Sequence, residues 1–280
     1  MPTFDFKQVD VFASEPLKGN PLAVVIAADG LPDDRMAAFA RWTNLSETIF
    51  LLRPTTPRAD YRVRIVTPGG ELPFAGHPTL GACAVWLASG GRARGDTIVQ
   101  ECPAGLITLR LDGSRMAFAA PPLVRSGPVE PDLLPRIAAG LGLAVGEIRE
   151  ARWVDNGPGW LAVLLGTRRR VLALRPDPAV LGDLKVGVVA PWDPVVDGPQ
   201  AQFEVRAFVP GLGIPEDPVT GSLNAGVAQW LIGAGLAPES YVASQGTALG
   251  RAGRVHIGKS GADIWVGGEV VTCIEGTVTL

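Results

Sequence analysis

The amino-acid sequence predicts an α+β protein built from two similar halves. Segments rich in β-branched and aromatic residues recur along all 280 residues, whereas only a few stretches have the pattern of a helix. The 35 glycines and 25 prolines fall between the apolar runs, which is typical of short strands joined by tight turns. A third observation, an internal repeat, divides these elements between two halves of one design.

Helices are expected at residues 33–43, 78–89, 131–140 and 219–232. The first has Pro32 directly before it and acidic residues in its opening turn, as helix starts often do. The strand-like segments are FKQVDVFA, LAVVIA, ETIFLL, YRVRIVT, TIVQEC and LITLRL, followed by WLAVLLG, FEVRAFV, RVHIGKS, ADIWVGG and EVVTCIEGTVTL.

The internal repeat rests on landmarks that recur in the same order in both halves. The first half contains, in order, RIVTP, a proline, His77 before a proline, a small-residue helix ending in Trp-Leu, and a later glutamine. The second half contains RAFVP, a proline, Asp217 before a proline, a similar helix, and another glutamine. The separations range from 139 residues, between Ala23 and Ala162, to 145 residues, between Gln100 and Gln245. The proline-rich segment 120–131 is the expected seam, which gives domains 1–120 and 121–268.

Charge and cysteine content exclude several classes of function. The net charge is −3 and the basic residues are scattered, so neither nucleic acid nor membrane is an expected partner. The densest basic run, Arg168–Arg170, is expected in a solvated loop. The three cysteines lack paired spacing and the two histidines lie far apart, which predicts neither a disulfide framework nor a metal site. The N-terminus has no secretory signal and no long uncharged apolar run exists, so a cytoplasmic protein is expected.

Two polar residues stand directly before prolines that are expected to open helices. His77 and Asp217 are therefore placed near N-cap positions, followed by small residues that leave backbone N–H groups accessible. The orphan donors and the dipole of a helix N-terminus attract anions. Two such helix starts facing each other would form a pocket that binds a carboxylate and stabilises an oxyanion. The simpler alternative for Asp217 is an ordinary N-cap.

A third candidate, Glu47, opens the apolar strand TIFLL. A glutamate at the mouth of a strand buried on both faces is partly desolvated, which raises its pKa toward neutrality and suits a general acid/base. The alternative is a strand-end residue in water that bonds locally to Ser46 or Thr48. His256 lies within a strand-like alternation and is expected to be a half-exposed strand residue. No Rossmann, Walker or serine-hydrolase motif is present, so no cofactor is expected.

Five blocks of the sequence, VDVFASEPLKGNPLAVV, NLSETIF, PFAGHPTLGA, PEDPVTGS and QGTALGR, run in order from Val9 to Arg251. Together they resemble the PhzF-like family, which is named for an isomerase of phenazine biosynthesis. The resemblance implies a diaminopimelate-epimerase-like fold, with two pseudo-twofold-related α+β domains, each a curved, mostly antiparallel sheet around a central helix, and the active site between them. It further implies that the C-terminal strand, about 269–280, completes the first domain, and that the protein is a homodimer.

The resemblance also implies roles for individual residues. Glu47 of the SET block would be the general acid/base, while His77 and Asp217 contact the substrate. Related epimerases and racemases carry a cysteine at each helix start, but no thiol stands at the corresponding places here, and Cys83 is expected in a buried structural role. The remaining substrate-binding residues would be Ser46, Gly76, Gly221 and Ser222.

These expectations define a function and its rivals. The favoured hypothesis is a cofactor-independent isomerase that moves a proton within a small, cyclic carboxylic or amino acid, so the expected partner is a small anionic carboxylate. In the family's named member the substrate is trans-2,3-dihydro-3-hydroxyanthranilate. The alternatives are an epimerase or lyase on the same fold, a non-catalytic small-molecule-binding protein, and a homodimeric scaffold without a ligand.

Overall fold

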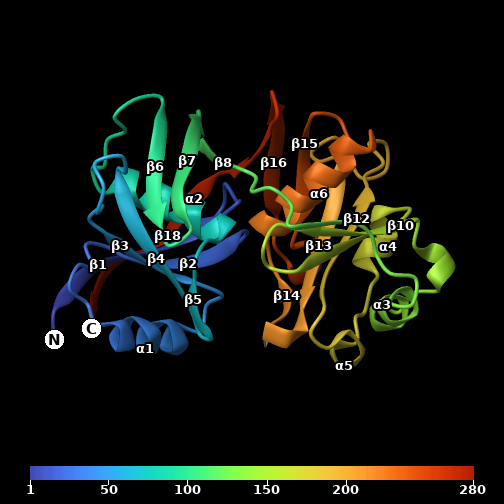
Figure 1. Ribbon diagram of the computed structural model, residues 1–280, viewed down its shortest axis with the longest axis horizontal. Helices are drawn as coiled ribbons and strands as arrows, with labels where there is room; N and C mark the ends of the chain where they lie inside the picture. The colour runs from blue at the N-terminus through green and yellow to red at the C-terminus, as the bar shows by residue number, and fades with distance from the viewer. Residues whose placement is uncertain (213) are drawn as a thin grey trace. The chain divides into compact units, whose positions relative to one another are not determined.

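The computed structural model describes residues 1–212 and 214–280, and it divides into two compact units (Figure 1). Unit 1 contains Met1–Ala119 and Gly267–Leu280, and unit 2 contains Ala120–Val266. The last strand, β18 (Val270–Thr279), pairs antiparallel with the first, β1 (Thr3–Val11), so the end of the chain completes the sheet of unit 1.

The sheet of unit 1 has the hydrogen-bonded order β18-β1-β2-β3-β4-β6-β7-β8. It is parallel at β2–β3 and β4–β6 and antiparallel elsewhere, and β5 forms a short hairpin with β4. The remaining elements of this unit are β2 (Asn20–Val25), α1 (Asp33–Thr43), β3 (Thr48–Leu52), β4 (Tyr61–Thr67), β5 (Gly70–Leu72), α2 (Gly76–Ala88), β6 (Thr97–Cys102), β7 (Gly105–Asp112) and β8 (Arg115–Ala119).

Helix α2 is the centre of unit 1, in contact with β1, β2, β3, β4, β6, β8 and β18 (Figure 1). The helix lies so close to β2 that a Cβ atom at Gly81 would overlap the Leu22 side chain. Strand β3 is buried at every position, as expected for a strand covered on both faces. Its Phe50 and Leu52 pack in one cluster with Met36 and Phe39 of α1, so the two helices cover opposite faces of β3.

Unit 2 repeats this plan. Its sheet order is β9-β10-β11-β12-β13-β15-β16, again parallel at two places, β11–β12 and β13–β15, and β14 pairs with β13. Its elements are β9 (Arg125–Pro128), α3 (Leu134–Leu141), η1 (Val145–Glu147), β10 (Glu150–Asp155), β11 (Trp160–Leu164), α4 (Arg168–Leu172), α5 (Pro178–Leu181), β12 (Lys185–Pro191), β13 (Phe203–Val209), η2 (Pro210–Leu212), β14 (Ile214–Asp217), α6 (Gly221–Gly233), β15 (Ser240–Gln245), η3 (Thr247–Leu249), β16 (Gly253–Ser260) and β17 (Asp263–Gly268), whose last two residues fall in unit 1.

Helices α2 and α6 are both 13 residues long, and the first residues of the two, Gly76 and Gly221, are 145 positions apart. Gly81 and Gly226 have the same separation, and a Cβ at Gly226 would overlap the backbone of Val154. The predicted α+β class is confirmed, and each of the four predicted helices overlaps an observed one.

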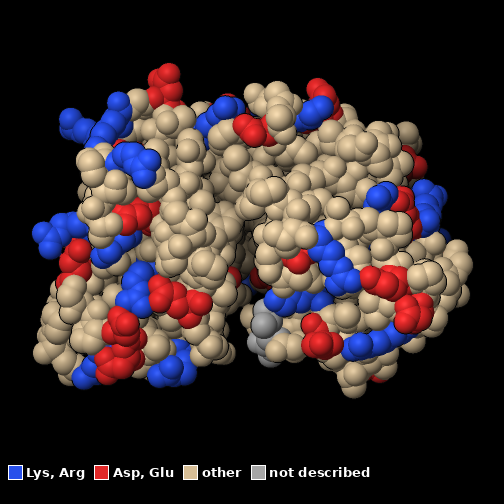
Figure 2. Space-filling model, viewed as in Figure 1, with Lys and Arg blue, Asp and Glu red and all other residues tan. Residues whose placement is uncertain are grey.

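Charged side chains of both signs are interspersed on the face shown in Figure 2, and the described residues of that face form no large patch of one sign. No helix within residues 1–212 and 214–280 is both long and apolar enough to cross a membrane.

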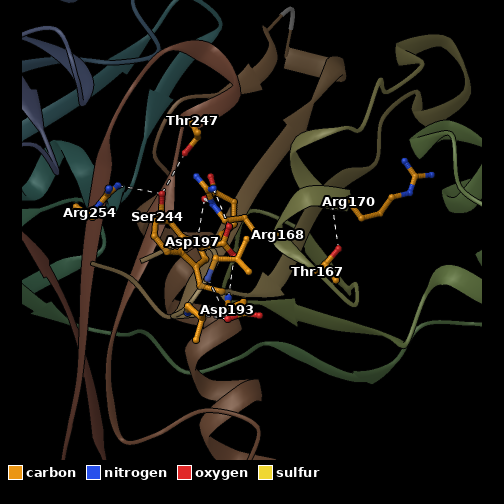
Figure 3. Close-up of polar contacts among 12 residues, drawn as sticks. Thr167, Arg168, Arg170, Asp193, Asp197, Ser244, Thr247 and Arg254 are labelled. Atoms are coloured by element: carbon orange, nitrogen blue, oxygen red, sulfur yellow. Dashed lines mark hydrogen bonds and ion pairs between the residues drawn. The ribbon is translucent and has the colours of Figure 1, made fainter. Parts of the chain in front are cut away.

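The expectation of a solvated loop at Arg168–Arg170 is wrong, because these residues begin helix α4. Thr167 caps the helix by accepting a hydrogen bond from the Arg170 backbone N–H. Arg168 is drawn inward by two carboxylates: its Nε lies 3.0 Å from Glu204 Oε2 and its Nη1 3.3 Å from Asp197 Oδ1 (Figure 3). Glu204 is fully buried and needs a cationic partner, which explains why this arginine is not solvated.

Candidate functional site

The polar contact at the centre of unit 1 joins Glu47 and His77. Glu47 lies in the short connection between α1 and β3, directly before the first buried residue of that strand, and its side chain is 15% exposed. His77 is the second residue of α2 and its side chain is 6% exposed. The Nε2 atom of His77 lies 3.4 Å from Oε2 of Glu47. Ser46 and Gly76 are the chain neighbours of these two residues.

The surroundings of His77 keep its imidazole neutral. Burial lowers the pKa of His77 from 6.5 to about 3, so the contact with Glu47 joins a neutral ring to a carboxyl group and is no ion pair near neutral pH. The other ring nitrogen, Nδ1, lies 3.5 Å from Nδ2 of the fully buried Asn20. With this amide nitrogen as donor, Nδ1 accepts, and the ring carries its proton on Nε2, facing Glu47.

The other three predicted site residues lie in unit 2, around the start of α6. Asp217 ends β14, and Gly221 and Ser222 are the first two residues of the helix. Thr220 precedes them as the N-cap, and its hydroxyl donates to Asp217 Oδ2 at 2.5 Å. The structure therefore places Asp217 beside the helix start rather than on it.

This placement corrects the expectation that His77 and Asp217 occupy corresponding positions near N-caps. The N-caps are Ala75 and Thr220, and the second residue of α6, the position that His77 has in α2, is Ser222. Thr220 stays extended, with its backbone N–H bonded to Gln245 Oε1, so the helix begins three residues after the proline. Pro78 lies inside the first turn of α2, where no N–H is required.

Ser222 is fixed by two neighbours in unit 2. Its hydroxyl oxygen accepts from Trp160 Nε1 at 3.0 Å, and its carbonyl accepts from Asn156 Nδ2 at 2.8 Å. An indole N–H can only donate, so the hydroxyl proton of Ser222 remains to be donated elsewhere.

Neither central helix has a side-chain cap hydrogen bond at its N-terminus, and neither has an acidic residue in its first turn. The first-turn N–H groups and the helix dipole can thus receive an anionic group at each helix start. The described residues contain no group of three or more His, Cys, Asp or Glu side chains that could hold a metal ion.

Several residues around the candidate site carry no chemical signature in the sequence. Asn20 and Trp160 are not predicted as site residues, and Thr220 is predicted only as one of the small residues that leave backbone N–H groups accessible, because each acts through a contact made in three dimensions. Gln245 had a positional signal as a landmark of the repeat, although its role was not visible. Cys83 lies fully buried within α2, as expected, and burial raises the pKa of its thiol to about 12.

Comparison with known proteins identifies the family. The family model for phenazine biosynthesis-like proteins (PhzC-PhzF) matches residues 9–276. The trans-2,3-dihydro-3-hydroxyanthranilate isomerase of Pseudomonas aeruginosa is 35% identical, with 95% of this chain and 92% of the relative covered. The antisense-enhancing sequence 1 protein of Schizosaccharomyces pombe is also 35% identical, with 99% of both chains covered.

Among solved structures, a PhzF-family phenazine biosynthesis protein from Enterococcus faecalis is similar over the full length of both chains, with a TM-score of 0.83 and 27% identity. A hydroxyproline epimerase from Agrobacterium vitis shares the fold with a TM-score of 0.57 and 15% identity, over 99% of this chain and 92% of its own. The epimerase-like fold implied by the sequence blocks is therefore confirmed. This chain belongs to the PhzC-PhzF family of phenazine biosynthesis-like proteins and is an isomerase.

Proposed function

We propose that this protein is a cofactor-independent isomerase that moves a proton within a small, cyclic carboxylic or amino acid, with Glu47 as the single acid/base. The observation that carries the proposal is the contact between Glu47 and His77. A largely buried carboxyl group lies 3.4 Å from a neutral imidazole whose protonated nitrogen faces it. A positioned carboxylate of this kind is a suitable general base for a carbon-bound proton.

The two residues have different roles in this proposal. His77 has a pKa of about 3 and would hold no extra proton near pH 7, so it is unsuited to carry the transferred proton. Instead, His77 would orient the Glu47 carboxylate, whose Oε2 lies 3.4 Å from its Nε2. Because the imidazole is neutral, it orients Glu47 without placing a positive charge beside the base.

The reaction keeps atoms and electrons in balance. Glu47 accepts a proton from one carbon of the substrate, and the electron pair of the broken C–H bond moves into the adjacent unsaturated system. The protonated Glu47 then returns the proton to a different carbon, where a new C–H bond forms. Substrate and product have the same composition, so no external oxidant or reductant is required.

The substrate's anionic end is assigned to the helix starts. The uncapped N–H groups of α2 and α6, with Gly76 and Gly221 at their first positions, favour a carboxylate. Asp217 would orient an amino or hydroxyl group, Ser222 has a hydroxyl proton to donate, and Ser46 would complete the substrate-binding residues.

We further propose that the domains are residues 1–120 with 269–280, and 121–268. A cytoplasmic homodimer is proposed on the family resemblance.

Racemisation by two thiols is disfavoured by the residues at the helix starts. The first residues read Ala75-Gly76-His77 in one half and Thr220-Gly221-Ser222 in the other, without a cysteine. A one-base epimerase or a lyase remains the alternative reaction.

The test follows the substrate proton in deuterium oxide. Trans-2,3-dihydro-3-hydroxyanthranilate, the compound in the name of the Pseudomonas aeruginosa relative, and a panel of small cyclic carboxylic acids are incubated with enzyme and observed by NMR. An isomerase gives a product with a shifted double bond, and the new C–H carries the transferred hydrogen, or deuterium where the protonated Glu47 exchanges with the solvent before it returns the proton. Label that appears only at the starting carbon with inverted configuration indicates an epimerase, and loss of water or ammonia indicates a lyase. Labelling that persists unchanged in Glu47→Gln would refute the role of Glu47.

A further inference from the structure

Gln245 is a fully buried polar residue beneath the start of α6. It ends β15, where its backbone pairs with Val205 on one side and Gly253 on the other. Its neighbour Ser244 faces the opposite side of the sheet, where its hydroxyl accepts from Arg254 Nη1 at 3.1 Å (Figure 3). With β15 held in this way, the carboxamide of Gln245 is directed at the first turn of α6.

The orientation of the Gln245 carboxamide is fixed by backbone groups whose roles are unambiguous. The Thr220 N–H can only donate, and it lies 3.0 Å from Oε1; the Asp217 carbonyl can only accept, and it lies 3.2 Å from Nε2. A second donor, Asn224 Nδ2, reaches the same Oε1 at 2.8 Å. The carboxamide therefore cannot be turned round without breaking all three contacts.

This fixed orientation determines where the hydroxyl proton of Thr220 points. Gln245 Nε2 also lies 3.0 Å from Thr220 Oγ1, and because the amide nitrogen is a donor, the hydroxyl oxygen must accept there. Its own proton is left for Asp217 Oδ2 at 2.5 Å. The contacts thus form a directed chain that begins at Gln245 and ends on the Asp217 carboxylate.

We infer that Thr220 and Gln245 are positioning residues of the reaction: Gln245 sets the Thr220 hydroxyl so that it donates to Asp217, and this holds the carboxylate in the rotamer that orients the substrate. A hydrogen bond donated to a carboxylate favours its charged form and fixes its direction. The inference rests on the proposed role of Asp217.

The first half supplies a natural control. Gln100 has the corresponding place, is also fully buried, and donates from Nε2 to Thr79 Oγ1 at 3.0 Å. Its Oε1 accepts from the Tyr61 hydroxyl at 3.2 Å. This network ends in the core of unit 1, and none of these contacts involves a residue proposed to touch the substrate. The repeat therefore provides a glutamine in both halves, while only the second is linked to a proposed site carboxylate.

The kinetic test compares four variants of the full-length enzyme on the substrate identified in deuterium oxide. Thr220→Val keeps the shape of the side chain and removes the donor, so kcat should fall about 10- to 100-fold with KM changed by less than about threefold. Thr220→Ser restores the hydroxyl and should recover kcat to within about threefold of the wild type.

The third variant, Gln245→Glu, keeps the Thr220 side chain but replaces the amide donor by a carboxylate that can itself accept the Thr220 proton. It should lower kcat as Thr220→Val does. Thr79→Val removes a hydroxyl that is also buried, from the matching network of unit 1; it should lower the melting temperature comparably while kcat stays within about twofold. Equal losses of kcat in Thr79→Val and Thr220→Val would indicate a general packing effect and overturn the inference.

Asp217→Asn separates this inference from the proposed function. If Asp217→Asn is slow while Thr220→Val turns over at the wild-type rate, Asp217 matters but the positioning chain does not, and the inference fails. Crystal structures of Thr220→Val and Thr220→Ser give a readout that needs no substrate. The Asp217 carboxylate should leave its wild-type rotamer only in Thr220→Val. An unchanged rotamer in that variant would overturn the inference even if Asp217 proved dispensable.

Discussion

Replacing His77 by glutamine should change how the protein's stability depends on pH. In the folded protein burial lowers the pKa of His77 to about 3, whereas an imidazole in an unfolded chain titrates near its ordinary value of 6.5. Between these two values the unfolded chain binds one more proton than the folded protein. The stabilisation is therefore fully present above pH 6.5 and is lost progressively as the pH falls toward 3.

The size of the effect follows from these two values. Between pH 7 and pH 5 the unfolded imidazole becomes almost fully protonated while the folded one stays neutral, which lowers the free energy of unfolding by about 2 kcal/mol. Glutamine is uncharged in both states. Over the same interval the free energy of unfolding of His77→Gln should therefore fall by about 2 kcal/mol less than that of the wild type.

The assay is urea unfolding at a series of pH values, with the difference between wild type and variant as the measured quantity. Repeating the pair in a Glu47→Gln background removes any contribution from the neighbouring carboxyl group. NMR provides a direct view, because the chain has only two histidines and His256→Gln assigns their signals. If His77 were protonated and paired with Glu47, the difference would have the opposite sign: the free energy of unfolding of the wild type would rise relative to that of the variant as the pH falls.

Two further predictions concern the scaffold. Arg206 and Glu216 form a buried pair, with Nε–Oε1 and Nη2–Oε2 distances of 2.9 and 2.7 Å. Arg206→Met should therefore lower the free energy of unfolding in urea by about 3–5 kcal/mol, and adding Glu216→Met should recover part of this loss. Equal stability of the single and double variants would show that the unpaired Glu216 charge is not the cause. Alanine at Gly81 or Gly226 would overlap the packed neighbour of each helix and should lower the free energy of unfolding by about 1–3 kcal/mol. Gly258→Ala has open space around its Cβ, so its free energy of unfolding should stay within about 0.5 kcal/mol of the wild type. Thermal or urea unfolding that ranks the Gly258 variant with the other two would contradict the close approach of these helices.

Much of the fold was readable because its signals are local in sequence. An apolar run marked β3, while Pro32 and the acidic residues of the opening turn marked the first helix, which is observed at the predicted residues 33–43. The internal repeat was visible because proline and glycine landmarks occur in the same order in both halves. Helices α4 and α5 were missed because they are 5 and 4 residues long, too short for a periodic pattern to show. Arg168 was misjudged for a related reason, since its partner Glu204 lies 36 positions away.

The candidate site was predictable only in part. His77 and Asp217 stood out as polar residues before prolines, but the sequence could not show that three residues, a bend at 218–219 and the extended Thr220, separate Asp217 from its helix. That offset depends on a hydrogen bond between Thr220 and Gln245, which are 25 positions apart. The tautomer of His77 likewise depends on Asn20, 57 positions away. Contacts of this kind leave no periodicity, so only the three-dimensional arrangement reveals them.

The most direct test of the account is the turnover of Glu47→Gln measured beside its affinity for the same substrate. Glutamine keeps the size of the side chain beside His77, but it cannot take a proton from carbon. The account predicts that kcat falls by about 100- to 10,000-fold while the dissociation constant changes by only a few-fold. Turnover within about tenfold of the wild type, with binding unchanged, would contradict the claim that Glu47 carries the proton.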